Sequence, residues 1–144
     1  MRQRAILLLC GIAILGMAQA PPAATMQQLM LDLIHPASND ILLFINRGAQ
    51  QDETGWASVR RSAVTLAESA NLLALPGRAP NGAQREAWMR DAQALAAVGA
   101  AAYKAAQAKD AKSLAALAEP LDRACTTCHQ QFRPNVFPRS GGSQ

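Results

Sequence analysis

The sequence predicts an all-α protein that folds as an antiparallel four-helix bundle. Alanine is abundant and runs of β-branched residues are absent, so the composition favours helices over a sheet. Apolar residues recur at intervals of three and four in several long stretches, which is the spacing of one helix face. Segments rich in Gly, Pro, Asn and Asp separate these stretches. Four amphipathic helices with short connections pack with successive helices antiparallel.

Residues 1–20 stand apart from this pattern and are typical of a cleaved secretory signal peptide. Arg2 and Arg4 form a basic start, Ala5–Met17 is an apolar run, and an Ala-x-Ala cleavage site follows. The alternative, a transmembrane anchor, would need about 20 apolar residues, which is longer than this run. Cys10 lies inside the apolar run, so we expect it to be removed with the signal peptide. The segment predicts export to the periplasm.

The first two helices are predicted over 25–47 and 56–75, with a polar connection between them. Gly48 ends the first helix, because glycine commonly follows the last helical turn. Pro36 lies inside the first helix, and we expect a kink there because the apolar stripe continues in phase on both sides. The apolar faces comprise Met26, Met30, Ile34, Ala37, Ile41, Phe44 and Ile45 in the first helix, and Trp56, Val59, Ala63, Leu66, Ala70 and Leu73 in the second.

A linker over 76–82 leads to a third helix over 83–108, whose many small residues allow a neighbouring helix or a flat cofactor to come close. Asp110 is the predicted N-cap of the last helix, Pro120 a local kink, and Pro134 its end. The apolar faces comprise Trp88, Ala92, Leu95, Gly99, Ala102, Tyr103 and Ala106 in the third helix, and Leu114, Leu117, Leu121, Ala124, Cys125, Cys128 and Phe132 in the last.

The last helix carries Cys125-Thr126-Thr127-Cys128-His129, the attachment signal for c-type haem. Each thiol can form a thioether with one vinyl group, and His129 then becomes the proximal iron ligand. The chain has three cysteines, and removal of Cys10 leaves both remaining ones in this motif. Spacings of three and four place the thiols and the imidazole on one side of the helix. We therefore predict one haem c, held covalently through Cys125 and Cys128.

Three other uses of a Cys-x-x-Cys pair have weaker support. A tetrahedral zinc site needs four ligands, and the chain has no second cysteine pair. A thioredoxin-like redox motif belongs after a strand, at a helix start, in an α/β pattern. A disulfide would close too small a loop to stabilise the fold much, and it would leave His129 unexplained. A non-haem helical protein with a metal-binding or redox-active cysteine pair is therefore the most distant alternative.

The segment from Cys125 through Phe132 and Arg133 resembles the C-terminal signature of the cytochrome c′ family, in which an aromatic and a basic residue follow the haem motif. Helix number, haem position and length agree over the haem domain expected at 21–134, which a loose tail over 135–144 follows. The resemblance implies a periplasmic monohaem protein, often homodimeric through its first two helices. It also implies that Arg133 lies near the proximal face or a propionate, although a solvated cation favoured at a helix C-terminus would explain this residue equally well.

The sixth iron ligand decides between two functions. In methionine-ligated members of the family a methionine of the first helix binds the iron, and Gln28-Leu29-Met30 resembles that region. Met26, one turn earlier, is the lesser candidate, and either methionine could instead be a core filler. His35 is a rival, but five residues of α-helix place it roughly 140° around the axis from Met30. We therefore expect Met30 as the distal ligand and His35 at the surface.

A His129–Met30 pair favours an electron carrier, because a thioether ligand raises the reduction potential. The alternative is a five-coordinate haem protein that binds or scavenges NO or another small gas. We expect redox proteins as partners, and the family resemblance adds a homodimer. Nucleic-acid binding is not expected, because the net charge of +4 falls to +2 without Arg2 and Arg4, and no basic block stands out. We expect no membrane span in the mature chain and no enzymatic activity, because no catalytic Ser/His/Asp set, phosphate loop or paired carboxylates occur.

Overall fold

A computed structural model describes residues 22–48 and 52–135. The predicted signal peptide with Cys10, and all of the predicted tail except Asn135, lie outside the described residues. Within the described residues the chain forms helices joined by turns, with no strand. The predicted all-α class is therefore confirmed. No helix in this part of the chain has both the length and the apolar character needed to cross a membrane.

The first helical segment consists of α1 (Met26–Gln28), the π-helical turn η1 (Leu29–Ile34) and α2 (His35–Arg47). Thr25 caps its start in a capping box: the backbone N–H of Gln28 donates to the Thr25 hydroxyl at 3.2 Å, and the Gln28 side chain accepts from the Thr25 N–H at 3.0 Å. Gly48 follows with a φ of 54°, the left-handed conformation that glycine adopts at low cost. The predicted ends of this helix are confirmed.

The backbone before Pro36 differs from the prediction. The His35 N–H donates to the Met30 carbonyl, five residues back, so the chain forms a π-turn where a simple kink was expected. The predicted apolar stripe is confirmed in part, because Met26 and Met30 pack against the core but are only half-buried. Leu29, absent from the predicted stripe, is buried, and the next buried residue is Ile34, five positions later. A π-turn accommodates this spacing because it holds one more residue per turn than an α-helix.

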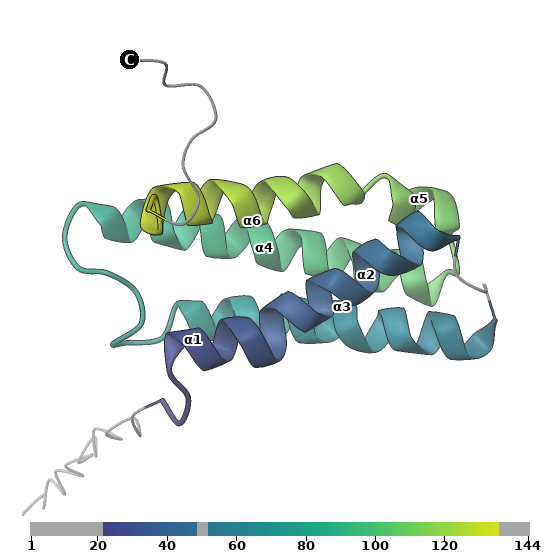
Figure 1. Cartoon of the computed structure of the whole chain (residues 1–144), viewed down its shortest axis with the longest axis horizontal. Coiled ribbons are helices and arrows are strands. Elements are labelled where there is room, and N and C mark those ends of the chain that lie inside the picture. Colours follow the sequence, from purple (N-terminus) through teal and green to yellow (C-terminus); the bar gives the residue numbers. More distant parts are fainter. Residues whose placement is uncertain (1–21, 49–51, 136–144) are drawn as a thin grey trace, which may run out of the picture.

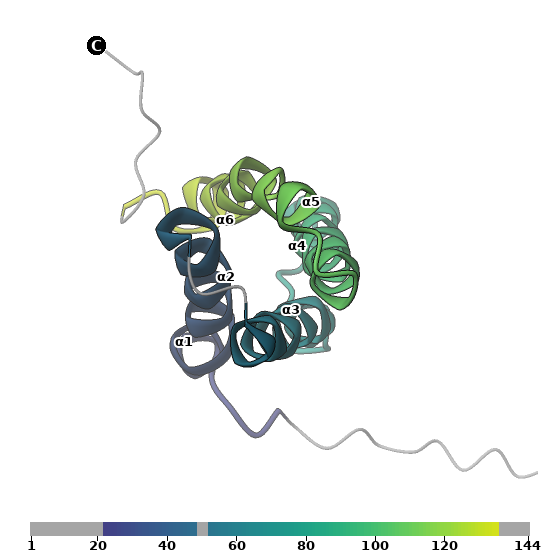
Figure 2. The ribbon, with the colours of Figure 1, turned by 90° about the vertical axis from the view of Figure 1, so that its right-hand side faces the viewer.

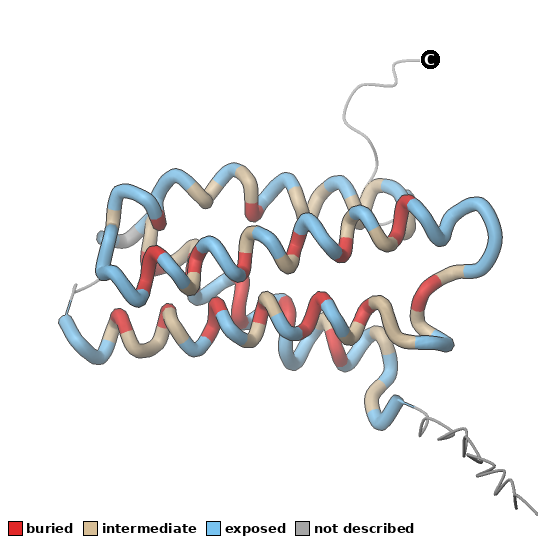
Figure 3. The backbone as a smooth tube through the Cα atoms, turned by 180° about the vertical axis from the view of Figure 1, so that it is seen from behind, coloured by how far each residue is buried: buried red, intermediate tan, exposed pale blue. Residues whose placement is uncertain are grey.

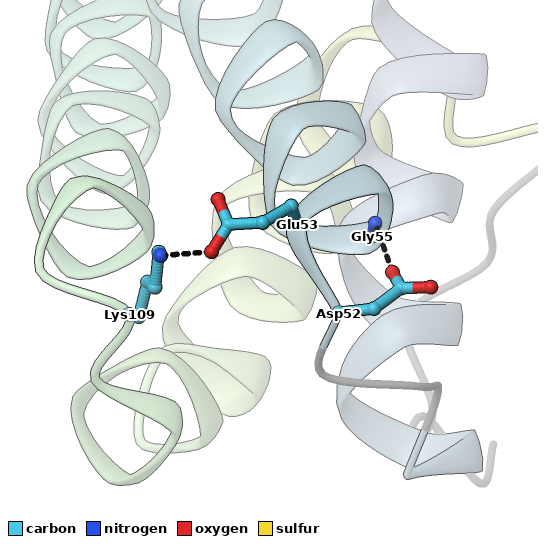
Figure 4. A network of polar contacts seen from close by, with 4 residues as sticks. All are labelled: Asp52, Glu53, Gly55 and Lys109. Atoms are coloured by element: carbon cyan, nitrogen blue, oxygen red, sulfur yellow. Dashed lines mark hydrogen bonds and ion pairs between the residues drawn. The ribbon is translucent and has the colours of Figure 1, made fainter.

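The second segment, α3 (Glu53–Leu73), begins three residues earlier than predicted. Asp52 caps it by accepting the N–H of Gly55 at 2.7 Å, as Figure 4 shows. The third segment, α4 (Gln84–Gln107), matches the prediction closely. The Lys109 ammonium, just beyond α4, pairs with the Glu53 carboxylate at the start of α3 (Figure 4), so this contact ties one end of α4 to α3.

The last segment is broken into α5 (Ala111–Ala115) and α6 (Ala118–Phe132), where one helix with a local kink was predicted. Asp110 caps α5 as expected, because its carboxylate accepts the Ser113 N–H at 3.0 Å. Pro120 is the third residue of α6, a position where the missing N–H would have no partner inside the helix. The proline therefore starts a new helix and does not bend an existing one.

The described residues thus form four helical segments, which surround a common core (Figures 1 and 2). Figure 3 shows the buried positions on the sides where the segments face one another. The closest approach is between α3 and α4: a Cβ on Gly99 would lie 2.6 Å from the Ala67 nitrogen, so only glycine fits at this position. The largest fully buried side chains are Trp56, Leu29, Ile41, Leu66, Leu114, Leu121 and Val59.

Candidate functional site

A pocket of about 590 Å³ lies between the start of the first helical segment and the end of α6. These two parts of the chain share one end of the molecule, at the left of Figure 1. The lining of the pocket combines sulfur, imidazole, aromatic and guanidinium groups. The lining residues are Met26, Gln27, Met30, Leu31, Trp88, Cys128, His129, Phe132 and Arg133.

One side of the pocket is formed by the predicted haem-attachment motif. Cys128 and His129 line the pocket, whereas Cys125 lies outside the lining and packs, half-buried, against the hydrophobic core. Both sulfurs are free thiols. All three residues lie in the last turns of α6, so the helix holds them at fixed spacings along one side. The motif therefore presents two thiols and an imidazole to the same end of the molecule.

The opposite side of the pocket is formed by the first helical segment. Met26 and Met30 both line the pocket and are half-buried. His35 is exposed and lies outside the lining, as expected for a surface histidine. The angle predicted between His35 and Met30 around the helix axis was wrong. It assumed an α-helix, whereas the π-turn lies between these two residues. The sequence did not single out Gln27 or Leu31 as pocket residues.

Trp88 and Phe132 form an aromatic wall of the pocket. Their ring centroids lie 4.9 Å apart at an interplanar angle of 78°, an edge-to-face contact. The Trp88 Nε1–H donates to the Leu73 carbonyl at 2.8 Å, which pairs one of the carbonyls left open at the end of α3. The sequence left two roles open for Trp88, packing on a porphyrin and a place in the core, and favoured the core. The structure adds that this buried ring fixes α4, the end of α3 and the last turn of α6 to one another.

Burial sets the protonation of the two thiols. Burial raises the pKa of Cys128 to about 11, with a further contribution from the nearby Asp91 carboxylate. Burial also raises the pKa of Cys125, and Asp122 adds to the effect. Both thiols are therefore protonated at neutral pH. A thioredoxin-like site depends on a thiolate with a lowered pKa, so these cysteines lack its defining property.

Burial lowers the pKa of His129, and the adjacent Arg133 guanidinium lowers it further. The imidazole is therefore neutral at neutral pH, which is the form that binds a metal. Arg133 caps the end of α6, where its N–H donates to the His129 carbonyl at 2.7 Å. Its side chain lines the pocket and is exposed, so its position agrees with both roles that the sequence left open.

A tetrahedral zinc site would need four protein ligands. Among residues 22–48 and 52–135, no three or more His, Cys, Asp and Glu side chains lie together in a way that could hold a metal ion. Comparisons with protein-family models, with curated proteins and with solved structures find no match for this chain. The interpretation of the pocket therefore depends on its own residues and on the motif.

Proposed function

We propose that this protein is a periplasmic monohaem c-type cytochrome of the cytochrome c′ type that carries electrons. The observation that carries the proposal is that one pocket has Cys128 and His129 of α6 on one side and Met26 and Met30 of the first segment on the other. The motif alone predicts only a haem attached to α6. A pair of thioethers across the same pocket supplies the second kind of iron ligand that a six-coordinate site needs.

The residues present fit a haem c. The pocket volume of about 590 Å³ lies within the range of roughly 300–1,000 Å³ that is usual for small-molecule and cofactor sites. Cys125 and Cys128 would hold the group covalently, and His129 would bind its iron. Met30 is the proposed distal ligand, with Met26 as the second candidate. Trp88 and Phe132 offer an apolar aromatic wall of the kind that excludes water.

When bound, the haem supplies the one-electron redox chemistry, and the chain supplies binding, orientation and a dry pocket. A neutral His129 is available as a nitrogen donor, because burial lowers its pKa. A Met30 thioether would raise the reduction potential and favour the reduced state. Burial raises the pKa of Cys125 and of Cys128, which disfavours redox-active thiolates and supports the assignment of both residues as tethers.

We further propose the antiparallel four-helix bundle as the arrangement of the four segments, with redox proteins as partners and homodimer formation as in many proteins of the cytochrome c′ family. The assignment to the periplasm depends on the predicted signal peptide over residues 1–20. The proposed protein is a carrier and not an enzyme, because its substrate is the electron that partner proteins deliver and remove.

One observation favours a second function, the binding of a small gas. Leu31 lines the pocket although 58% of its surface is exposed, so the distal side opens to solvent. A weakly held methionine beside such an opening would let NO or CO reach the iron. The two functions differ in the spin state and in the response to CO.

The test uses the full chain, exported with its own signal peptide in a host that attaches haem c. Mass spectrometry of the denatured protein should show one covalently attached haem, and its absence would overturn the proposal. Oxidised spectra should be low-spin with a methionine–iron(III) charge-transfer band, and reduced spectra should change little with CO. A high-spin spectrum that responds readily to CO would establish the gas-binding function in its place.

Because two methionines line the pocket, the ligand test needs Met30→Ala, Met26→Ala and the double variant. We expect Met30→Ala to weaken the charge-transfer band and the double variant to abolish it. Met89→Ala is the matched control, because Met89 is also half-buried but lies on α4 outside the pocket lining. Retention of the band in the double variant would exclude methionine ligation.

A further inference from the structure

We infer that the π-turn η1, held open by Pro36, determines which side chains of the first helical segment line the pocket. This inference rests on the proposed function, in which Met30 is the distal ligand. Met26 and Met30 lie at the start of this segment and α2 follows the π-turn. The turn therefore sets the rotation of the two methionines relative to the half of the segment that packs in the core.

The hydrogen bonds define where the extra residue lies. The Leu29 N–H donates to the Thr25 carbonyl at 3.0 Å, four residues back, as in an α-helix. The His35 N–H donates to the Met30 carbonyl, five residues back. The chain therefore changes from α-helical to π-helical bonding between these two points and returns to α-helical bonding in α2.

The burial pattern supports the same conclusion independently. From the last residue of the turn onward, the buried apolar residues Ile34, Ala37, Ile41 and Phe44 follow at intervals of three and four. The preceding buried residue is Leu29, the first residue of the turn, five positions ahead of Ile34. Two residues five positions apart, such as Leu29 and Ile34, lie on the same helix face only when the turn between them holds one additional residue.

Pro36 gives a physical reason for the turn at this place. Proline has no N–H to donate, and in an α-helix its ring would clash with the carbonyl four residues back, which is that of Asp32. Lengthening the turn moves this carbonyl away from the proline ring. Pro36 is exposed, so its effect on the backbone does not depend on packing in the core.

An uninterrupted α-helix would rotate the start of the segment by about 100°, the angle of one residue. Leu31 would then take the place that Met30 has in the pocket, and Met30 would take the buried place of Leu29. Gln27 would replace Met26 in the same way. Both thioethers would leave the pocket, so the π-turn selects methionine over leucine as the side chain offered to the iron.

The test is Pro36→Ala in the haem-loaded protein. Alanine is the best helix former and the site is exposed, so the variant is expected to fold, and Pro36→Gln serves as a second variant. We expect loss of the methionine–iron(III) charge-transfer band with an unchanged mass for the attached haem. A crystal structure of the variant should show hydrogen bonds to the fourth residue back throughout 29–36.

A rescue experiment separates a change of rotation from general damage. Leu31→Met added to Pro36→Ala should restore the charge-transfer band, because residue 31 then occupies the place that Met30 has in the wild type. Leu33→Met in the same background is the matched control, since Leu33 is also exposed, at 39%, and should restore nothing.

Persistence of the π-turn in the structure of Pro36→Ala, or an unchanged band in a variant that has become α-helical, would overturn the inference. A wild-type protein with covalent haem but no methionine band would instead contradict the proposed ligand. In that case the inference is judged by whether Leu31 replaces Met30 in the pocket of the Pro36→Ala structure. The two failures are therefore distinguishable.

Discussion

The two ends of the molecule differ in how completely their local interactions are satisfied. At the end that carries α5 and the start of α3, Asp52 and Asp110 cap their helices and Lys109 pairs with Glu53 (Figure 4). Trp56 is 2% exposed in the core, where its ring lies 4.8 Å from that of Phe44. These contacts follow the ordinary rules of helix capping and core packing.

The pocket end departs from the same rules. Two buried polar atoms have no hydrogen-bond partner among the described residues, the Nε of Arg78 and one carboxylate oxygen of Asp91. The first helical segment changes to π-helical bonding here, and Leu31 exposes 58% of its surface. Arg78 belongs to this end because its guanidinium donates to the Ala24 carbonyl, just before α1, at 3.0 Å.

An unpaired buried polar group costs free energy, and π-turns are rare and frequently occur at functional sites. The two unpaired atoms and the π-turn therefore lie at the pocket end, although Thr25 caps the start of α1 there in the usual way. This distribution is expected of a functional site, because proteins tolerate local deviations where function requires them. We therefore expect a substitution at the end with α5 to change mainly the free energy of unfolding. An equivalent substitution at the pocket end should also change the pocket.

The largest expected effect concerns the two tryptophans. Trp56→Ala should lower the free energy of unfolding by about 3–5 kcal/mol, the usual cost of removing a buried aromatic ring. Trp88→Ala should cost less, because its partner Phe132 is only half-buried, but it should change the haem spectrum of the loaded protein. Urea unfolding and optical spectra measure both effects. A spectral change in Trp56→Ala and none in Trp88→Ala would contradict the comparison.

The fold class and most helix ends could be predicted because they depend on local signals. Gly48 and Asp110 act on their own helix ends, and they do so in the structure. The start of α3 was missed although its signal was present: Asp52 is an N-cap residue and Glu53 is acidic in the first turn. The stretch around them is polar, so it was predicted as a connection between helices although an N-cap residue was present.

The π-turn and the break before α6 could not be predicted by the periodicity argument. That argument assumes 3.6 residues per turn, so it cannot register the additional residue between Leu29 and Ile34. Pro36 and Pro120 each lack the N–H that an α-helix needs, and the sequence pattern does not distinguish a bent, a widened and an interrupted helix. In one case the chain widened its turn, and in the other it began a new helix.

The candidate site was predictable to the extent that it is local. Cys128 and His129 were predicted from the motif spacing and Met30 from the family resemblance, and all three line the pocket, whereas Cys125, the other motif cysteine, lies outside the lining. Gln27 and Leu31 were not assigned to the pocket and Trp88 was favoured as a core residue, because their place in the pocket depends on how the first segment, α4 and α6 come together. A sequence pattern gives the face of each helix but not the point at which two faces meet.

A smaller effect concerns the two caps. Asp52→Ala and Thr25→Ala each remove an N-cap side chain and should each lower the free energy of unfolding by about 1 kcal/mol. Only Thr25→Ala should alter the spectrum of the loaded protein, because Thr25 holds the turn that carries Met26. Chemical unfolding with spectra taken before denaturation measures both. Equal spectra in the two variants would show that the first turn does not influence the pocket.

The smallest effect concerns Asp91, and its sign depends on pH. Burial raises the pKa of Asp91 in the folded state, so the folded protein holds this proton more tightly than the unfolded chain does. The stabilising contribution of the protonated carboxyl is therefore complete below the unfolded pKa of about 3.9. It is lost as the pH rises through the folded-state pKa, and the ionised carboxylate then opposes folding.

Asp91→Asn should therefore be more stable than the wild type at pH 7, and this advantage should shrink as the pH falls toward 4. Asp122→Asn is the matched control, because it removes an exposed carboxylate that is also close to a cysteine of the motif. Urea unfolding of the loaded proteins at both pH values measures the difference. A loss of stability in Asp91→Asn at pH 7 would mean that the carboxylate has a favourable partner in the loaded protein, and the Nε of Arg78 would then be the remaining unpaired atom of the two at the pocket end.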